Sequence, residues 1–190
     1  MTQPPQPRRS AAEQARLDAA MTLLFEQQIS FNQVLGLKID AGPLPSRART
    51  LGGQRGRAAA SVGAQTFTGY GANGPTLRFD MRPELVGHYL YGRLHGGVIS
   101  ATLDATGGFA LMWAIAEKHA DETAAQVMQR FAKLGTIDLR VDYLRPGLGK
   151  HFIASAEVMR LGGRVGTTQM RLVNDDGTLI ATAAAAYVVS

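Results

Sequence analysis

An apolar stretch in the middle of the chain, LHGGVISATLDATGGFALMWAIAEK (94–118), carries a single aspartate, Asp104. A helix that is apolar on nearly all sides belongs inside a domain, where an unpaired ionised carboxylate is costly. A carboxylate kept there is a candidate for chemistry, because it can attack a carbonyl carbon or deprotonate a water that does so. The sequence leaves both roles open. The structural alternative is an acid satisfied by local backbone or by a hydroxyl such as that of Ser100.

The same stretch begins with residues suited to holding an oxyanion, His95, Gly96 and Gly97. Attack on a carbonyl leaves negative charge on its oxygen, and backbone N–H groups at a helix N-terminus are donors aligned with a favourable dipole. Glycine lets this backbone approach a substrate closely, whereas a glycine-rich helix start without chemistry is the plain alternative. His95 can cap the helix, shape its first turn or bind substrate, and we predict a positional role for it.

Composition predicts one globular domain, since the chain has 190 residues of which 45% are hydrophobic. It contains no cysteine, so a disulfide framework, a thiolate nucleophile and a Cys-ligated metal are excluded. The four histidines lack zinc-ligand spacing and the glycines lack a nucleotide-binding fingerprint, so we expect neither metal nor bound cofactor. We see no targeting segment and no membrane span, and we predict a soluble, cytoplasmic protein.

The net charge of +5 comes from one segment. No acid lies between Ala41 and Phe79, and the basic residues outside this segment are balanced by the 15 acids of the chain. The segment is rich in Gly, Ala, Ser and Arg without periodicity, so we predict a flexible Arg/Gly-rich insertion at about 43–74. The alternative is a contact for acidic partners such as nucleotide phosphates or RNA. The arginines between Ala41 and Phe79 are Arg47, Arg49, Arg55, Arg57 and Arg78.

Periodicity predicts a helix before this segment and a strand after it. Ser10 and Glu13 have capping-box spacing, and apolar residues follow on one helical face to about Ser30. In TLRFDMR (76–82) apolar and charged residues alternate, as in a strand with one buried face. We therefore divide the chain into residues 1–30, a tail and an amphipathic helix, and residues 31–190, the main domain.

The C-terminal third predicts antiparallel strands. From Thr136 apolar residues alternate with charged ones until Pro146 and Gly147, and Leu161–Gly163 lies between two further strand patterns as in a hairpin. A second turn at Asn174–Gly177 precedes TLIATAAAAYVVS, whose small side chains would let a helix lie close to the sheet. An antiparallel sheet wrapped around one long central helix is the hotdog fold, in the α+β class.

The segments HGGVISATLDATGG and GTIDLRVDYLRPG, with the spacing from His95 to Asp104, resemble the PaaI-like hotdog acyl-CoA thioesterases, the YigI type in particular. The resemblance runs from about Phe31 to the C-terminus, apart from the Arg-rich segment. It implies hydrolysis of medium- to long-chain acyl-CoA to free acid and CoA, without metal or cofactor. It also implies that Asp104 is the catalytic carboxylate, Gly96 the main oxyanion donor, and Thr136 the hydroxyl that holds water or thioester.

Four further residues are candidate substrate contacts. His88 and Tyr89 stand where many of these relatives have Asn or Gln, and an imidazole N–H of His88 could polarise the carbonyl in their place. A surface histidine is the alternative. Arg145 and Arg164, with Lys150 and Arg160, stand near predicted strand ends where cations could meet CoA phosphates.

Spacing also predicts an oligomer. Nine residues of helix separate His95 from Asp104 by about 13 Å, too far for both ends to act on one thioester. Two antiparallel central helices related by a two-fold axis would bring Asp104 of one chain to Gly96 of the other, so we expect a homodimer with shared active sites, or a tetramer. Two other readings remain: a non-catalytic hotdog module that binds or senses acyl-CoA, and nucleic-acid binding through the Arg-rich segment.

Overall fold

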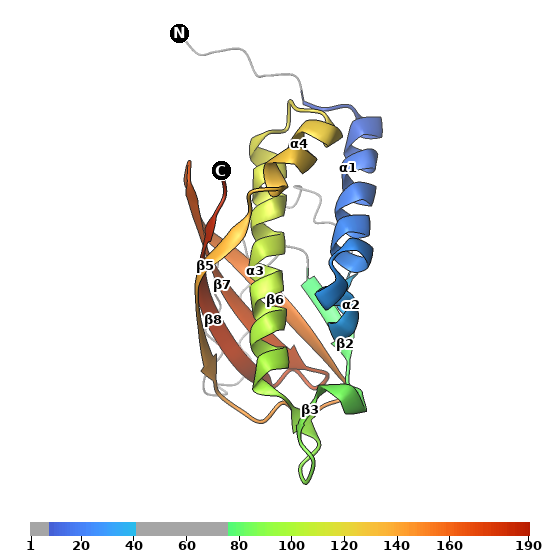
Figure 1. Cartoon of the computed structure of the whole chain (residues 1–190), viewed down its shortest axis with the longest axis vertical. Helices are drawn as coiled ribbons and strands as arrows, with labels where there is room; N and C mark the ends of the chain where they lie inside the picture. Colours follow the sequence, from blue (N-terminus) through green and yellow to red (C-terminus); the bar gives the residue numbers. More distant parts are fainter. Residues whose placement is uncertain (1–7, 41–75) are drawn as a thin grey trace, which may run out of the picture.

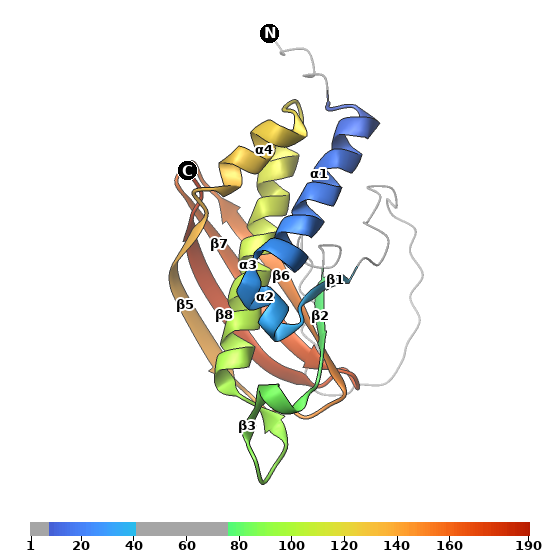
Figure 2. The same ribbon diagram turned by 45° about the vertical axis from the view of Figure 1, so that its right-hand side comes forward.

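The computed structural model describes residues 8–40 and 76–190, and the predicted insertion at about 43–74 lies outside this part of the chain. A curved antiparallel sheet holds one long helix against its concave face, with shorter helices beside and above it (Figures 1 and 2). The helices are α1 (Ala11–Leu23), the π-helix η1 (Leu24–Gln28), α2 (Ser30–Leu35), the 3-10 helix η3 (Pro83–Leu85), α3 (Gly96–Lys118) and α4 (Ala124–Phe131).

Six strands form the sheet in the order β1-β2-β6-β7-β8-β5, and β3 and β4 form a separate hairpin. Both predicted turns, at 161–163 and 174–177, connect antiparallel neighbours. Gly177 has a φ of 81°, which suits the turn chemistry predicted there. The strands are β1 (Lys38–Asp40), β2 (Thr76–Asp80), β3 (Val86–His88), β4 (Arg93–Leu94), β5 (Gly135–Tyr143), β6 (His151–Leu161), β7 (Val165–Asn174) and β8 (Leu179–Val188).

The long helix α3 lies against the sheet as predicted, and the hotdog architecture is confirmed. Its closest approach is at Gly107, where a Cβ atom would lie 2.3 Å from the Tyr187 hydroxyl and 2.8 Å from Thr168 Oγ1. A larger residue would push the helix off the sheet. By length and composition α3 could also cross a membrane. Its packing on the sheet accounts for that apolar composition, because more than half of its most apolar window is buried.

The first helix is fastened to the end of α3. Ser10 caps α1 as predicted, but Glu13 does not complete the capping box: its Oε2 accepts from the backbone N–H of Ala124, at 3.0 Å, and so caps α4 instead. Arg9 donates to the carbonyls of Ala116 and His119, where a cation also suits the C-terminal end of a helix dipole.

The α-helix α1 ends at Leu23, earlier than the predicted Ser30. The π-helix η1 follows it directly, and α2 begins at Ser30. The buried face is nevertheless the predicted one. Leu17, Met21 and Phe25 lie in the same hydrophobic core as α3, and the rings of Phe25 and Phe109 are 4.8 Å apart.

Helix α4 and a bulge in β5 were not predicted. Thr123 and Gln126 form a full capping box at the start of α4, and this signal is present in the sequence. In β5, Thr136 pairs with Tyr187 and Asp138 with Ala186, so Ile137 is an extra residue and is 59% exposed. The predicted alternation is broken at that point. Regular strand then ends three residues before Pro146.

Candidate active site

The turn before α3 leaves one backbone donor free. His95 is the N-cap of α3, and its Nδ1 accepts the Gly97 N–H at 2.9 Å. Val98 and Ile99 donate to the His95 carbonyl at 3.0 and 3.3 Å. Among the described residues the N–H of Gly96 alone in this first turn has no acceptor. The two glycines proposed as oxyanion donors therefore differ, because Gly97 is already used in the cap and Gly96 is available.

Close packing around His95 fixes this cap. The His95 N–H donates to the carbonyl of Leu85 at 2.8 Å, and a Cβ atom on Gly87 would lie 2.5 Å from His95 Cα. A Cβ atom on Gly97 would lie 2.9 Å from the imidazole Nδ1. Position 97 therefore requires glycine for a structural reason, because a side chain there would displace the capping imidazole.

Tyr143, at the end of β5, lies over the start of α3. Its hydroxyl donates to the Gly96 carbonyl at 3.2 Å. A Cβ atom on Gly96 would make only ordinary contacts, the nearest 3.5 Å from Tyr143 Cε1. The protomer itself therefore does not require glycine at 96. Tyr143 was not among the predicted site residues, although its place at the end of an alternating strand was visible in the sequence.

Asp104 is half-buried, on the side of α3 that the sheet leaves uncovered. Its Oδ1 accepts a hydrogen bond from Thr136 Oγ1 at 2.8 Å, so the structure brings these two predicted residues together. No partner of Oδ2 is found in the part of the chain that the structure describes. Ser100 does not satisfy the carboxylate, because its hydroxyl donates to the Gly97 carbonyl. One carboxylate oxygen is thus held by Thr136, and the other is left without a hydrogen bond among the described residues.

Tyr187, in β8, binds the same turn of α3 from the side of the sheet. Its hydroxyl donates to the Asp104 carbonyl at 2.9 Å, and burial together with the nearby Asp104 charge raises the pKa of Tyr187 well above its usual value. It therefore stays a protonated donor. Thr136 and Tyr187 are paired across β5 and β8, so the strand register places both hydroxyls beside Asp104. This role was not predicted; its sequence signal is a single aromatic residue in the alanine-rich strand.

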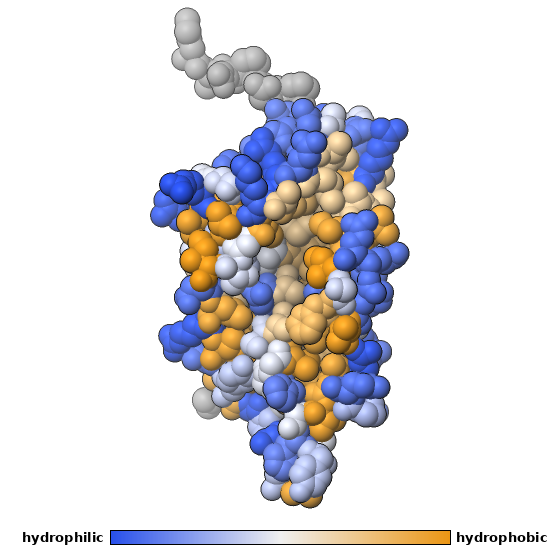
Figure 3. Space-filling view, in the orientation of Figure 1, coloured by the Kyte–Doolittle hydropathy of each residue, from blue (hydrophilic) through white to orange (hydrophobic). Residues whose placement is uncertain are grey.

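Within one protomer the carboxylate and the free donor stay apart. α3 is unbroken from Gly96 to Asp104, and eight residues of helix correspond to about 12 Å. The uncovered side of the helix carries small residues around Asp104: Ala101 precedes it, and Ala105 and Gly108 follow it. A recessed, weakly hydrophobic band marks this side of the molecule in Figure 3, and both strongly hydrophobic and hydrophilic residues flank it.

Known proteins share this arrangement of sequence and fold. The model of the thioesterase superfamily matches residues 91–181. The chain is 40% identical over 113 residues to the medium/long-chain acyl-CoA thioesterase YigI of Salmonella typhimurium, which covers 60% of this chain and 73% of that relative. The chain belongs to the thioesterase superfamily. The protein of the same name from Escherichia coli K12 is 39% identical over the same shares.

A solved structure agrees. A Shewanella oneidensis protein related to the thioesterase superfamily superposes with a TM-score of 0.74 at 31% identity, covering 96% of this chain and 100% of that one. The family predicted from the sequence and the reaction class, thioester hydrolysis, are confirmed.

Of the substrate-contact candidates in this thioesterase, His88 and Tyr89 lie in the β3–β4 hairpin, which projects beyond the start of α3 (Figure 1). His88 is half-buried, and its Nδ1 has no partner among the described residues. Its ring packs against those of Tyr89 and Tyr91, with centroids 5.6 and 4.7 Å away. Tyr89 is 87% exposed at the tip. The hairpin thus holds His88 near the HGG turn and Tyr89 away from the sheet.

The two arginines do not converge. Arg145 donates to the Leu179 carbonyl at the start of β8, whereas Arg164 precedes β7, whose first residue pairs with Val188 at the end of β8. The ten residues of β8 therefore separate them by roughly 30 Å. They cannot hold neighbouring phosphates within one protomer. No group of His, Asp and Glu that could bind a metal is found in residues 8–40 and 76–190.

Proposed function

We propose that the chain hydrolyses medium- to long-chain fatty acyl-CoA to the free fatty acid and CoA. The observation that carries the proposal is the pairing of Asp104 with Thr136 on the uncovered side of α3, with one carboxylate oxygen left open. The relatives YigI, which are medium/long-chain acyl-CoA thioesterases, support the substrate class. A soluble cytoplasmic enzyme fits this substrate, and that location stays a prediction.

The chemistry needs no group beyond the chain and water. Thr136 holds Asp104 Oδ1, and Oδ2 either attacks the thioester carbonyl carbon or takes a proton from a water that attacks it. Both routes place negative charge on the carbonyl oxygen, and the free Gly96 N–H donates to it. Collapse of this intermediate breaks the carbon–sulfur bond and expels the CoA thiolate. On the first route an acyl-aspartate anhydride remains, and one water then hydrolyses it to the free acid and the Asp104 carboxylate.

The active unit we propose is a homodimer, or a tetramer built from such dimers. The roughly 12 Å between Gly96 and Asp104 lets them act together only when they come from different chains. The small residues on this side of α3 would allow the α3 helices of two protomers to lie antiparallel and close, which brings each Asp104 to the partner's helix start.

The decisive assay is release of free thiol from acyl-CoA over a series of chain lengths. Turnover should be highest for medium and long chains, and Asp104→Asn should lower kcat by at least about a hundredfold with an unchanged melting temperature. A folded Asp104→Asn variant with near-normal turnover would refute the catalytic assignment. Tight acyl-CoA binding without any thiol release by the unaltered protein would favour the binding-module alternative instead.

Mixed dimers test the shared site. Asp104→Asn and Gly96→Pro should each inactivate the enzyme, but a heterodimer has one site with both lesions and one site with neither. Random pairing makes about half of the dimers mixed, so unfolding and refolding the two variants together should restore roughly a quarter of the unaltered activity. Mixing without refolding is the control. Two folded dimeric variants that show no recovery would mean that each chain carries a complete site.

A further inference from the structure

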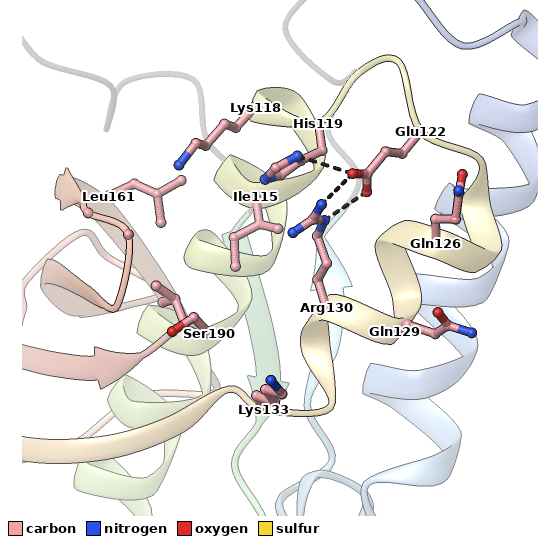
Figure 4. A pocket seen from close by; sticks show the side chains of 13 residues that line it. Ile115, Lys118, His119, Glu122, Gln126, Gln129, Arg130, Lys133, Leu161 and Ser190 are labelled. Atoms are coloured by element: carbon pink, nitrogen blue, oxygen red, sulfur yellow. Dashed lines mark hydrogen bonds and ion pairs between the residues drawn. The ribbon is translucent and has the colours of Figure 1, made fainter.

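A hollow of about 530 Å³ opens at the C-terminal end of α3, away from the HGG turn (Figure 4). Its walls are the last turn of α3, helix α4, and the turn between β6 and β7. It is polar for a cavity of this size, and its titratable lining is mostly basic: Lys118, His119, Glu122, Arg130 and Lys133.

The single acidic side chain in this lining, Glu122, is already paired. Arg130 Nε donates to Glu122 Oε2 at 2.7 Å, its Nη2 contacts the other oxygen, and His119 Nδ1 lies 3.4 Å from Glu122. The Arg130 guanidinium holds the pKa of Glu122 below its usual value, so this carboxylate stays ionised and paired. Lys118 and Lys133 have no ion pair within the described residues. Figure 4 shows them on opposite sides of the hollow.

Two arginines, Arg160 and Arg164, are sequence neighbours of residues that line the hollow, although neither is part of the lining. Gly162 and Gly163 line the hollow, and a Cβ atom on Gly162 would lie 3.9 Å from Arg160 Nε. Arg164 follows Gly163 directly and is exposed. The β6–β7 turn thus places further positive charge near the basic wall. Excess positive charge around a concave space is suited to an anion with several charges.

The hollow lies within reach of the candidate active site. Ile115, in its wall, is 11 residues after Asp104, which is three helical turns along the same face and roughly 16 Å. On the other side Lys133, in the turn before β5, is three residues before Thr136 and so at most roughly 10 Å from it along the backbone. The pantetheine arm of CoA has about the length of four extended residues, roughly 14 Å. A thioester at Asp104 could therefore place its phosphorylated end in this space.

We propose that this hollow binds the phosphates at the nucleotide end of CoA, with Lys118 and Lys133 as the principal contacts. The inference rests on the proposed acyl-CoA substrate and adds the subsite that recognises its leaving group. A phospholipid headgroup presents the same phosphate chemistry, so the two sources must be separated by experiment.

The test compares acyl-CoA with the acyl-pantetheine of the same chain, which carries the same thioester without the nucleotide. In Lys118→Ala/Lys133→Ala, kcat/KM for acyl-CoA should fall about tenfold through KM, while kcat/KM for acyl-pantetheine should change by less than about twofold. The control Lys38→Ala/Arg78→Ala also removes two positive charges, at ion pairs of β1 and β2 that do not line the hollow, and should leave kcat/KM for both substrates unchanged. Calorimetry with 3′,5′-ADP should show binding to the unaltered protein and to the control, and none to the lysine variant.

Several results would overturn this subsite. An equal loss on both substrates would place the lysines in folding or in the chemistry, and no loss on either would remove them from binding. Sedimentation with phosphatidylglycerol vesicles that depends on the two lysines, without discrimination between the substrates, would assign the hollow to a lipid headgroup. Absence of any thiol release would instead be a failure of the proposed function, and the 3′,5′-ADP titration would still decide whether the hollow binds the nucleotide.

Discussion

The substitution Gly96→Pro removes one hydrogen-bond donor with little other change. Gly96 is the first residue of α3, a position where proline is common because its missing N–H would have no helical acceptor. The preceding residue, His95, has φ −66° and ψ 138°, which is the extended conformation that a residue before proline prefers. The Gly96 N–H has no partner among the described residues, so no hydrogen bond seen in the protomer is lost.

The expected effect is therefore on the reaction and not on folding. Loss of one oxyanion donor lowers kcat by about 100- to 1000-fold, or about 2.7–4 kcal/mol of transition-state stabilisation. The added Cβ atom would lie no closer than 3.5 Å to Tyr143, an ordinary contact. We expect the free energy of unfolding to change by less than about 1 kcal/mol.

Gly96→Ala is the matched control, because it adds the same Cβ atom and keeps the N–H. Both variants are to be compared in thiol release under saturating acyl-CoA, after thermal unfolding has shown that they are folded. The reasoning requires the proline variant to fall far below the alanine variant in kcat. A proline variant within about threefold of the alanine variant would place the oxyanion donor elsewhere.

Substitutions at three other positions test the contacts that hold the site in place: the Thr136 hydrogen bond, the His95 cap and the close packing of α3 on the sheet. Thr136→Val removes the donor to the carboxylate and should lower kcat about tenfold or more in thiol release, whereas unchanged kcat would show that the carboxylate needs no orientation. His95→Ala should cost about 1 kcal/mol in thermal unfolding and His95→Asn much less, since asparagine also caps helices; equal losses of kcat in both would indicate that the imidazole takes part in the chemistry. Gly107→Ala should lower the free energy of unfolding by about 1–3 kcal/mol, because its Cβ would lie 2.3 Å from the Tyr187 hydroxyl. Gly108→Ala, whose Cβ would have its nearest contact at 3.8 Å, should leave the free energy of unfolding of the protomer nearly unchanged.

Elements that depend on local pattern were predictable from the sequence. The strands after Thr136 follow from period two, and the two turns follow from their glycines, because both signals act between residues a few positions apart. The start of α3 at the HGG sequence was predictable for the same reason. Helix α4 was predictable as well, through the Thr123–Gln126 capping box, but that signal was overlooked.

Contacts that depend on register were not predictable. The roles of Tyr143 and Tyr187 arise where β5 lies relative to α3 and β8, across 47 and 83 residues of sequence. The bulge at Ile137 has no local signal, and it shifts the register of β5 on β8 by one residue between Thr136 and Asp138. The predicted capping box at Glu13 was half wrong because a nonlocal acceptor, the Ala124 N–H, competes for the same carboxylate.

The strand β5 explains why the two halves of the candidate site are both held firmly and yet kept apart. Near its first residue, Thr136 binds the Asp104 side chain, and at its last residue Tyr143 binds the Gly96 carbonyl. One rigid strand thus fixes both the carboxylate and the helix start, at a separation that α3 sets at about 12 Å. If the active unit is the proposed dimer, each site takes its carboxylate from one copy of β5 and its oxyanion donor from the other. A loosened pairing of β5 with β8 would then disturb both the carboxylate and the oxyanion donor of each site. A change in the His95 cap would disturb only the oxyanion donor.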